Sequence, residues 1–261
     1  MSGIVFSVFT KPWKTMPIAE LAETVRRLGY DGIELPVRPG FQVEPETIGK
    51  LLPSAARALK AAGLKIFSVA GNTDEATIAA CGEAGVPVIR TMARIPDGAN
   101  YVEAEAAVQR EYDALLPALD RYGVTIGVQN HFGHYVPNAH ALLHLIKKYD
   151  PKQVAAVWDA AHEALAGGLP QHALDVLWPR LCMVNLKNAF YRRTNGPEAP
   201  YATWAHYWTS GRHGLTSWPG VVSELKKRGY KGVVCITAEY SSPEAERLAA
   251  EDLQFARSLF T

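Results

Sequence analysis

The sequence predicts a single (β/α)₈ barrel, and three observations support this prediction. Short apolar, β-branched segments alternate with helical segments along all 261 residues. Several helical segments end in a glycine directly before the next strand, where a left-handed helix stop is expected. Eight such alternations favour a closed parallel barrel over an open sheet, and a chain of this length suits one barrel domain spanning 1–261.

The expected strands are bounded by glycine, proline or polar residues. They are Ile4–Phe9, Gly32–Leu35, Lys65–Ala70, Val86–Met92, Val124–His131, Val154–Asp159, Leu181–Lys187 and Gly232–Glu239. The expected helices are Ile18–Leu28, Pro45–Ala62, Glu75–Ala84, Glu103–Tyr122, Ala139–Tyr149, His172–Trp178, Val221–Arg228 and Pro243–Leu259. The alternative fold, a doubly wound sheet, would need a glycine-rich phosphate loop after the first strand, where TKPWK stands instead.

Composition excludes several classes of protein. Lys and Arg number 27 against 26 Asp and Glu, so neither a basic field for nucleic acid nor an acidic excess is present. Three scattered cysteines do not make a disulfide framework, which favours a reducing cytoplasm. The first residues, MSGIVFSVFTKPWK, are expected to form a strand and not a signal peptide. No apolar run reaches the roughly 18 residues that cross a bilayer, so we expect a soluble cytoplasmic protein.

One connection is unusually long. The segment Asn188–Thr216 follows the seventh expected strand, and loops of this length are usually functional or disordered. Its many aromatic residues argue against disorder. We expect a lid in which Trp204, Tyr207 or Trp208, together with Arg212, contacts the substrate; the alternative is a contact in a homo-oligomer or with a partner subunit.

Polar residues gather at the C-terminal ends of the last four strands. Residues two apart on a strand share a face, so each pair is expected to face the barrel axis together. The pairs are Gln129 with His131, Asn185 with Lys187, and Thr237 with Glu239, while the sixth strand ends on Asp159 and His162 follows. Active sites of barrel enzymes lie at this end, so four consecutive polar strand ends predict a site there.

The chain resembles the xylose isomerase-like TIM barrels, the group of sugar phosphate isomerases and epimerases. The resemblance rests on the order and spacing of GYDGIEL, GVQNH, VWDAAH, VNLKNA and GYKGVVCITAEY. It implies a divalent cation, manganese, magnesium, zinc or cobalt, held by Glu, Asp, His and Glu from the last four strands. It also implies that the two glutamates act as acid and base on the sugar.

The matching positions here are Gln129, Asp159, Asn185 and Thr237, so only the aspartate is kept. Hard cations are held largely by carboxylate charge, and amide oxygens carry none. Gln129, Asp159 and Asn185 therefore remain as a depleted ligand set. A divalent cation (Mn, Mg or Zn) is expected to be weakly bound or absent.

The titratable groups lie one strand repeat higher, about 6.5 Å toward the mouth. His131, His162, Lys187 and Glu239 are the expected catalytic residues, and two interpretations remain open. In the first, the histidines, Asp159 and Glu239 hold a relocated metal. In the second, Glu239 or a histidine is a base and Lys187 stabilises an enolate oxygen. A base near neutral pH needs a raised pKa, which partial burial of Glu239 would supply and His131 or Lys187 would oppose. The alternative is that Glu239 only pairs with Lys187 to order the mouth of the barrel.

Two further residues are candidates for substrate binding. Trp13 lies in the first loop, as a sugar platform or as rim packing. Glu34 ends the second strand, where it either orients a substrate hydroxyl or pairs with Arg38 or Arg90.

Together these observations predict an enzyme that abstracts a proton beside a carbonyl of a sugar, keto-sugar or cyclitol. The outcome would be isomerisation, epimerisation or, in a lyase, β-elimination. The alternatives are a metal-poor carbohydrate-binding barrel and a barrel subunit of a hetero-complex. The density of ionisable groups at the strand ends favours the enzyme with a small carbohydrate-like substrate, because an inert binder does not need them.

Overall fold

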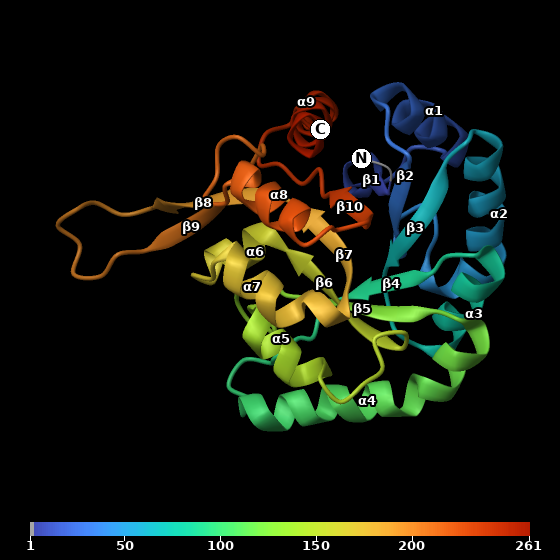
Figure 1. Ribbon diagram of the computed structural model, residues 1–261, viewed down its shortest axis with the longest axis horizontal. Coiled ribbons are helices and arrows are strands. Elements are labelled where there is room, and N and C mark those ends of the chain that lie inside the picture. The colour runs from blue at the N-terminus through green and yellow to red at the C-terminus, as the bar shows by residue number, and fades with distance from the viewer. Residues whose placement is uncertain (1–2) are drawn as a thin grey trace.

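The computed structural model describes residues 3–261 and contains a closed barrel of eight parallel strands (Figure 1). Around the barrel the order is β1-β10-β7-β6-β5-β4-β3-β2. The strands are β1 (Ile4–Phe9), β2 (Gly32–Pro36), β3 (Lys65–Ala70), β4 (Val88–Thr91), β5 (Thr125–Gln129), β6 (Val154–Asp159), β7 (Leu181–Leu186) and β10 (Gly232–Ile236). The predicted barrel is confirmed, since each of its expected strands is present.

Helices cover the outside of the barrel (Figure 1). They are α1 (Ile18–Leu28), α2 (Ile48–Ala61), α3 (Glu75–Ala84), α4 (Tyr101–Tyr122), α5 (Ala139–Ile146), α6 (Ala160–Leu165), α7 (Pro170–Leu177), α8 (Trp218–Lys227) and α9 (Ala245–Phe260). Short 3₁₀ turns occupy Lys11–Trp13, Pro45–Thr47 and Trp178–Arg180. The sequence did not indicate α6, a short helix of six residues that follows β6 directly. No helix within residues 3–261 is both long and apolar enough to cross a membrane.

Glycines matter at two kinds of position. Gly29 and Gly123 end α1 and α4 with φ of 92° and 64°, the left-handed conformation that was predicted for these stops. Gly127 in β5 serves a different purpose, because a Cβ there would lie 2.7 Å from Val157 and 2.9 Å from Val88. Because glycine has no Cβ, the neighbouring strands can pack closely at this point of the barrel interior.

The last barrel strand ends earlier than expected. β10 stops at Ile236, so Thr237 and Glu239 lie in the loop that follows and not on the strand. Ala238 between them has φ of 46°, a left-handed conformation that is costly for a residue with a Cβ. This turn, and not strand alternation, sets the direction of the Glu239 side chain. β5 likewise ends at Gln129, which leaves His131 in the following loop.

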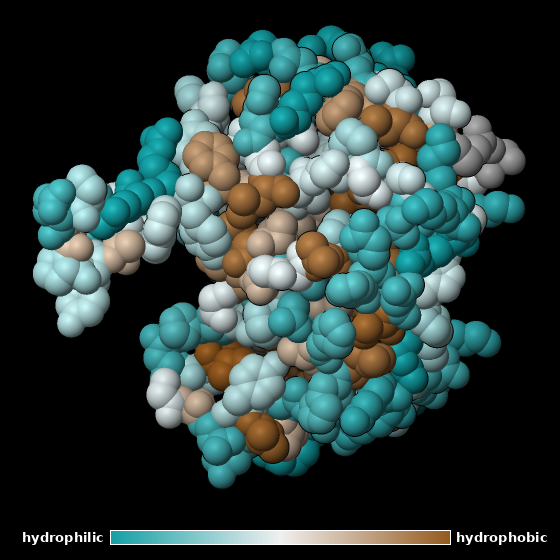
Figure 2. Space-filling view, turned by 60° about the vertical axis from the view of Figure 1, so that its left-hand side comes forward, coloured by the Kyte–Doolittle hydropathy of each residue, from teal (hydrophilic) through white to brown (hydrophobic). Residues whose placement is uncertain are grey.

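The long segment after β7 is a hairpin and not an irregular loop. β8 (Asn188–Arg193) and β9 (Trp204–Thr209) pair antiparallel from Asn188 opposite Thr209 to Arg193 opposite Trp204. The hairpin projects from the barrel as an arm (Figure 1), with a mostly hydrophilic surface in Figure 2. Tyr201 near its tip is 82% exposed. The long connection expected after the seventh strand therefore contains a hairpin, and cross-strand pairing gives this segment its own order.

Candidate active site

A cavity of about 90 Å³ lies at the C-terminal end of the barrel strands. Six of the expected residues line it together: Gln129, His131, His162, Asn185, Thr237 and Glu239. Asp159 and Lys187 contact these side chains, because Gln129 donates a hydrogen bond to Asp159 and Lys187 donates one to Glu239. Because β6 pairs with both β5 and β7, the strands that carry these groups are neighbours, as predicted.

Asp159 is fully buried and holds two parts of the site together. Its Oδ2 accepts a hydrogen bond from Gln129 Nε2 at 2.7 Å. Its Oδ1 accepts the backbone N–H groups of Ala161 and His162, both at 3.0 Å, and so caps α6. Burial raises the pKa of Asp159 to about 6, although the Lys187 charge and these hydrogen bonds oppose the rise.

A buried ion pair continues from Gln129 across the barrel. Arg90 Nε donates to both oxygens of Glu34, at 2.8 and 2.9 Å, and Arg90 Nη1 donates to Gln129 Oε1 at 2.5 Å. Ser68 Oγ donates to Glu34 Oε2 at 2.9 Å. The side chains of Arg90 and Glu34 are 5% and 0% exposed. The structure thus shows Glu34 paired with Arg90, which is the salt-bridge alternative of the sequence analysis.

Several buried polar atoms in the cavity have no hydrogen-bond partner among residues 3–261. They are both side-chain atoms of Asn185, Thr237 Oγ1 and His162 Nδ1, with Ser7 Oγ nearby in the barrel. An unpaired buried polar atom costs about 1–3 kcal/mol. Native proteins rarely leave such atoms without a protein, water or ligand partner. Asn185 and Thr237 therefore offer ready hydrogen bonds to a bound molecule.

The two histidines are uncharged, and their rings pack against each other at a tilt of 32°. Their ring centres lie 3.8 Å apart. His131 Nδ1 lies 2.8 Å from the Phe132 carbonyl, which can only accept, so Nδ1 carries the proton and Nε2 keeps a lone pair. Burial, reinforced by the Lys187 charge, lowers the pKa of His131 to about 4 and holds that of His162 well below its ordinary value.

Glu239 is held by two ammonium groups. Lys187 Nζ donates to Glu239 Oε2 at 2.6 Å, and Lys11 contacts the other oxygen. Lys187 Nζ also lies 3.5 Å from the ring centre of Trp208, a cation–π contact that fixes its position. Burial acts to raise the pKa of Glu239, but the charges of Lys187 and Lys11 outweigh it and lower this pKa to about 2. The expectation of a raised pKa is wrong, because two cations contact this carboxylate.

Four residues that were expected to bind substrate lie away from the cavity. Trp13 is buried in the main hydrophobic core. Trp204 is 59% exposed on the arm, and the ring of Tyr207 packs on Phe190 at 5.2 Å. The guanidinium of Arg212 lies 3.8 Å above the ring of Phe255. The structure does not bring these four residues to the cavity, and Trp208 is the arm residue that contacts the site.

Three cationic residues in the site were not proposed for it from the sequence. Lys11, Arg38 and Arg90 line the cavity. A signal for Arg90 was present, because it lies two residues after Val88 in an expected strand and so shares a face with that apolar residue. Lys11 lies in the TKPWK segment after the first strand, and no local pattern indicates that it turns toward Glu239.

The donor set does not fit the divalent cation that the family resemblance implies. The Gln129 oxygen accepts from a guanidinium, and both Asp159 oxygens already accept hydrogen bonds. The relocated-metal interpretation meets the same obstacle, because Glu239 is paired with Lys187 and Lys11. Within residues 3–261 no three His, Cys, Asp or Glu side chains are grouped as a metal site.

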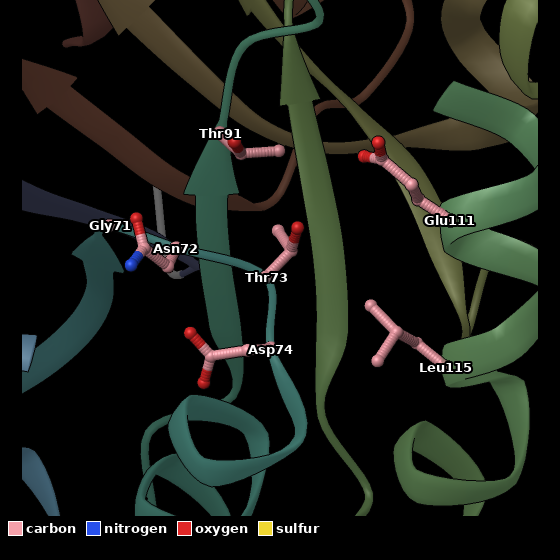
Figure 3. Close-up of a pocket in the computed structure, with 7 residues that line it drawn as sticks. All are labelled: Gly71, Asn72, Thr73, Asp74, Thr91, Glu111 and Leu115. Atoms are coloured by element: carbon pink, nitrogen blue, oxygen red, sulfur yellow. The ribbon is translucent and has the colours of Figure 1, made fainter. Parts of the chain in front are cut away.

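One larger hollow lies beside the cavity, and a second lies beyond it. A groove of about 510 Å³ shares Arg38, Arg90 and Met92 with the cavity. A second hollow of about 480 Å³ adjoins this groove; Figure 3 shows the loop after β3, from Gly71 to Asp74, facing Glu111 and Leu115 of α4 across it. Asp74 there caps α3 by accepting the N–H of Thr77 at 2.8 Å. The first groove is the one that continues the cavity.

The chain was compared with known proteins. No curated protein matches the sequence. Among solved structures, 3-keto-D-glucoside 4-epimerase, YcjR, from E. coli has 16% identity, a TM-score of 0.71 and coverage of 98% of this chain and 99% of the other. The probable 3-DHS dehydratase AsbF from Bacillus anthracis has 12% identity, a TM-score of 0.73 and coverage of 97% and 98%.

A third similar structure, the IOLI protein with a binding zinc atom, has 16% identity, a TM-score of 0.73 and coverage of 98% of this chain and 96% of the other. At these identities the likenesses establish the fold. A family model described as "Xylose isomerase-like TIM barrel" matches residues 22–259, most of the chain. The chain therefore belongs to the xylose isomerase-like TIM barrel family.

Proposed function

We propose that this protein is a sugar isomerase or epimerase-like enzyme that abstracts a proton beside a carbonyl of a sugar, keto-sugar or cyclitol. One observation carries the proposal. The unpaired polar atoms of Asn185, Thr237 and His162 point to a bound polar ligand, and they share one cavity with a free imidazole nitrogen and an ionised carboxylate. The similar structures named as an epimerase and a dehydratase support a small carbohydrate-like substrate.

His131 and Glu239 are the two proposed proton acceptors. β5 and β10, which precede them, are separated in the barrel by β6 and β7, so the two groups reach the cavity from different sides. His131 is neutral above pH of about 4, and Glu239 is ionised above pH of about 2. An epimerisation needs proton removal on one face of a carbon and return on the other. In this proposal one of the two groups removes the proton, and the other returns a proton that it has taken up from water.

Lys187 is the proposed partner of the developing enolate oxygen. In the structure its ammonium donates to Glu239, and Trp208 holds it in place. A substrate carbonyl that accepts from Lys187 would compete with Glu239 for this charge. As the ammonium turns to the substrate oxygen, Glu239 loses one of the two cations that lower its pKa and becomes a stronger base. The His162 ring packs against that of His131, and His162 remains uncharged.

The cavity is small in relation to a whole sugar. Pockets that enclose ligands usually measure about 300–1,000 Å³, and this cavity measures about 90 Å³. The carbonyl end of the substrate would therefore enter the cavity. The remainder would lie in the adjoining groove, past Arg38 and Met92.

Proton NMR in deuterated water tests the proposal. The protein would be incubated with separate ketoses, keto-glycosides and cyclitols, and each carbon-bound proton would be followed for exchange. We expect one class to exchange with wild type and to exchange at least tenfold more slowly with Glu239→Gln. Glu246→Gln is the matched control, because that exposed carboxylate pairs with Arg27 on the surface.

Three results would separate the alternatives. Loss of water from the substrate with accompanying exchange would assign a lyase. Chemical-shift changes without exchange in any compound would assign a carbohydrate-binding barrel and contradict an enzyme. Exchange that is equal in wild type and Glu239→Gln would remove Glu239 from the mechanism.

A further inference from the structure

The floor of the cavity is a continuous polar chain that leaves little for a metal ion to bind. Glu34 accepts from Arg90, Arg90 donates to Gln129, and Gln129 donates to Asp159. These contacts fix the amide of Gln129, with its oxygen toward the guanidinium and its nitrogen toward the carboxylate. A cation would find the Gln129 oxygen turned to another positive charge.

We propose that the Arg90 guanidinium takes the place of a divalent cation in this barrel, as the fixed positive charge that binds an oxygen of the ligand. The inference rests on the proposed function only in assuming that the ligand carries an oxygen that becomes more negative during reaction.

Arg90 has N–H groups that are not used within residues 3–261 and could bind such an oxygen. A guanidinium has five N–H groups. Glu34 accepts from Nε and pairs with Nη2, and Gln129 accepts from Nη1, which leaves an N–H on each terminal nitrogen. Arg90 lines both the cavity and the groove beside it. Burial acts to lower the pKa of Arg90, but the Glu34 charge outweighs it and raises this pKa, so the positive charge is permanent.

The other charges at the cavity also favour an oxyanion over a metal cation. The cationic side chains are those of Lys11, Arg38, Arg90 and Lys187, and the carboxylates are those of Glu34, Asp159 and Glu239. Each of these carboxylates already accepts hydrogen bonds from the protein. The guanidinium of Arg38, in contrast, has no hydrogen bond or ion pair with any residue between 3 and 261, and its pKa is lowered by burial and by the neighbouring Arg90 charge. An anionic oxygen in the cavity would relieve this repulsion, whereas a divalent cation would increase it.

A titration with Mn²⁺ alone tests the exclusion of metal. Binding is measured as the loss of the EPR signal of the free ion. Three proteins are compared: wild type, Gln129→Glu/Thr237→Glu, and the same variant with Glu34→Gln/Arg90→Met added. The added glutamates supply carboxylates beside Asp159, and Glu34→Gln avoids leaving a buried charge unpaired when Arg90 is removed. We expect no binding tighter than about 1 mM in the first two proteins. In the third, we expect affinity to rise by about 10²-fold or more.

Two results would overturn this part. One is a stoichiometric, micromolar Mn²⁺ site in wild type that Asp159→Ala abolishes. The other is failure of the third protein to bind Mn²⁺ while its circular dichroism stays that of the folded barrel, because Arg90 would then not be what excludes the metal.

Binding of glycolate, a small hydroxycarboxylate that suits the cavity, tests the positive role of Arg90. We expect saturable binding to wild type that is unchanged by a chelator and weakened about tenfold or more in Glu34→Gln/Arg90→Met. Arg57→Met, which removes an exposed arginine from α2, is the control and should bind as wild type does. Equal binding in the double variant, dependence on added Mn²⁺, or no saturable binding to wild type below about 50 mM would contradict the proposal. Neither experiment measures proton exchange, so failure here is distinguishable from failure of the proposed function.

Discussion

Removal of Arg90 alone is expected to destabilise the barrel severely. Both side chains of the Glu34–Arg90 pair are buried, at 0% and 5% exposure. In Arg90→Met, the Glu34 carboxylate would keep the hydrogen bond of Ser68 but lose its counter-charge. Breaking a buried pair on one side costs about 3–5 kcal/mol. In a chain of this size, about 1 kcal/mol shifts the unfolding midpoint by roughly 2–4 °C, so a fall of about 10 °C is expected.

Urea unfolding of a double-mutant cycle measures this effect. Glu34→Gln/Arg90→Met removes both charges, so it should cost less than Arg90→Met alone, although the Gln129 oxygen also loses its donor. The control is Arg27→Met, since the Arg27–Glu246 pair is exposed on both sides and should contribute only about 0.2–1 kcal/mol. The reasoning would be refuted if Arg90→Met unfolds within about 1 kcal/mol of wild type, or if the double variant loses the sum of the two single losses.

Four further predictions follow from the site. Glu239→Gln should keep the fold and lower turnover of bound substrate by about 10²-fold, the scale of a general base; a near-normal rate constant at saturation would contradict this. The acid limb of the rate profile should lie near the His131 pKa of about 4, and a limb near 6.5 would contradict an essential base with this lowered pKa. Below pH 6.5 His162 takes up a proton in the unfolded chain but not in the folded protein, because its pKa in the fold is lowered. Acidification from pH 7 to 5 should therefore lower the free energy of unfolding of wild type more than that of His162→Gln. An equal fall of this free energy with pH in both proteins, measured by urea unfolding, would show that His162 titrates normally. Trp208→Ala should loosen Lys187 and raise KM more than the arm-tip change Trp204→Ala, and equal effects would separate the arm from the site.

The arm allows a test of the lid hypothesis as well. Hydrogen exchange over residues 188–216 should slow at the base of the hairpin, around Trp208, when substrate binds. The exposed tip around Tyr201 should not change. Unchanged protection along the whole arm under saturating substrate would favour an interface with another chain.

The sequence by itself determined the barrel and the end of it at which the candidate site lies. Each barrel strand shows a local apolar pattern, and the predicted bounds of β1, β3 and β6 match the structure residue for residue. The helix stops at Gly29 and Gly123 depend on backbone conformation at one residue, which glycine alone signals. The gathering of Gln129, Asp159 and Asn185 also followed from the sequence, because parallel strand ends in a barrel must meet at one end.

Only the tertiary structure decided what these side chains do to one another. Lys11 and Glu239 are 228 residues apart, and they meet because β1 and β10 pair when the barrel closes. Together with the charge of Lys187, that of Lys11 reverses the expected direction of the Glu239 pKa shift. In the same way, Arg90 meets Gln129 because β4 lies beside β5, and this contact removes an oxygen that the sequence left available to a metal. Periodicity assigns a residue to a face, but a pKa and a ligand preference depend on the nearest charges, which come from strands that are distant in sequence.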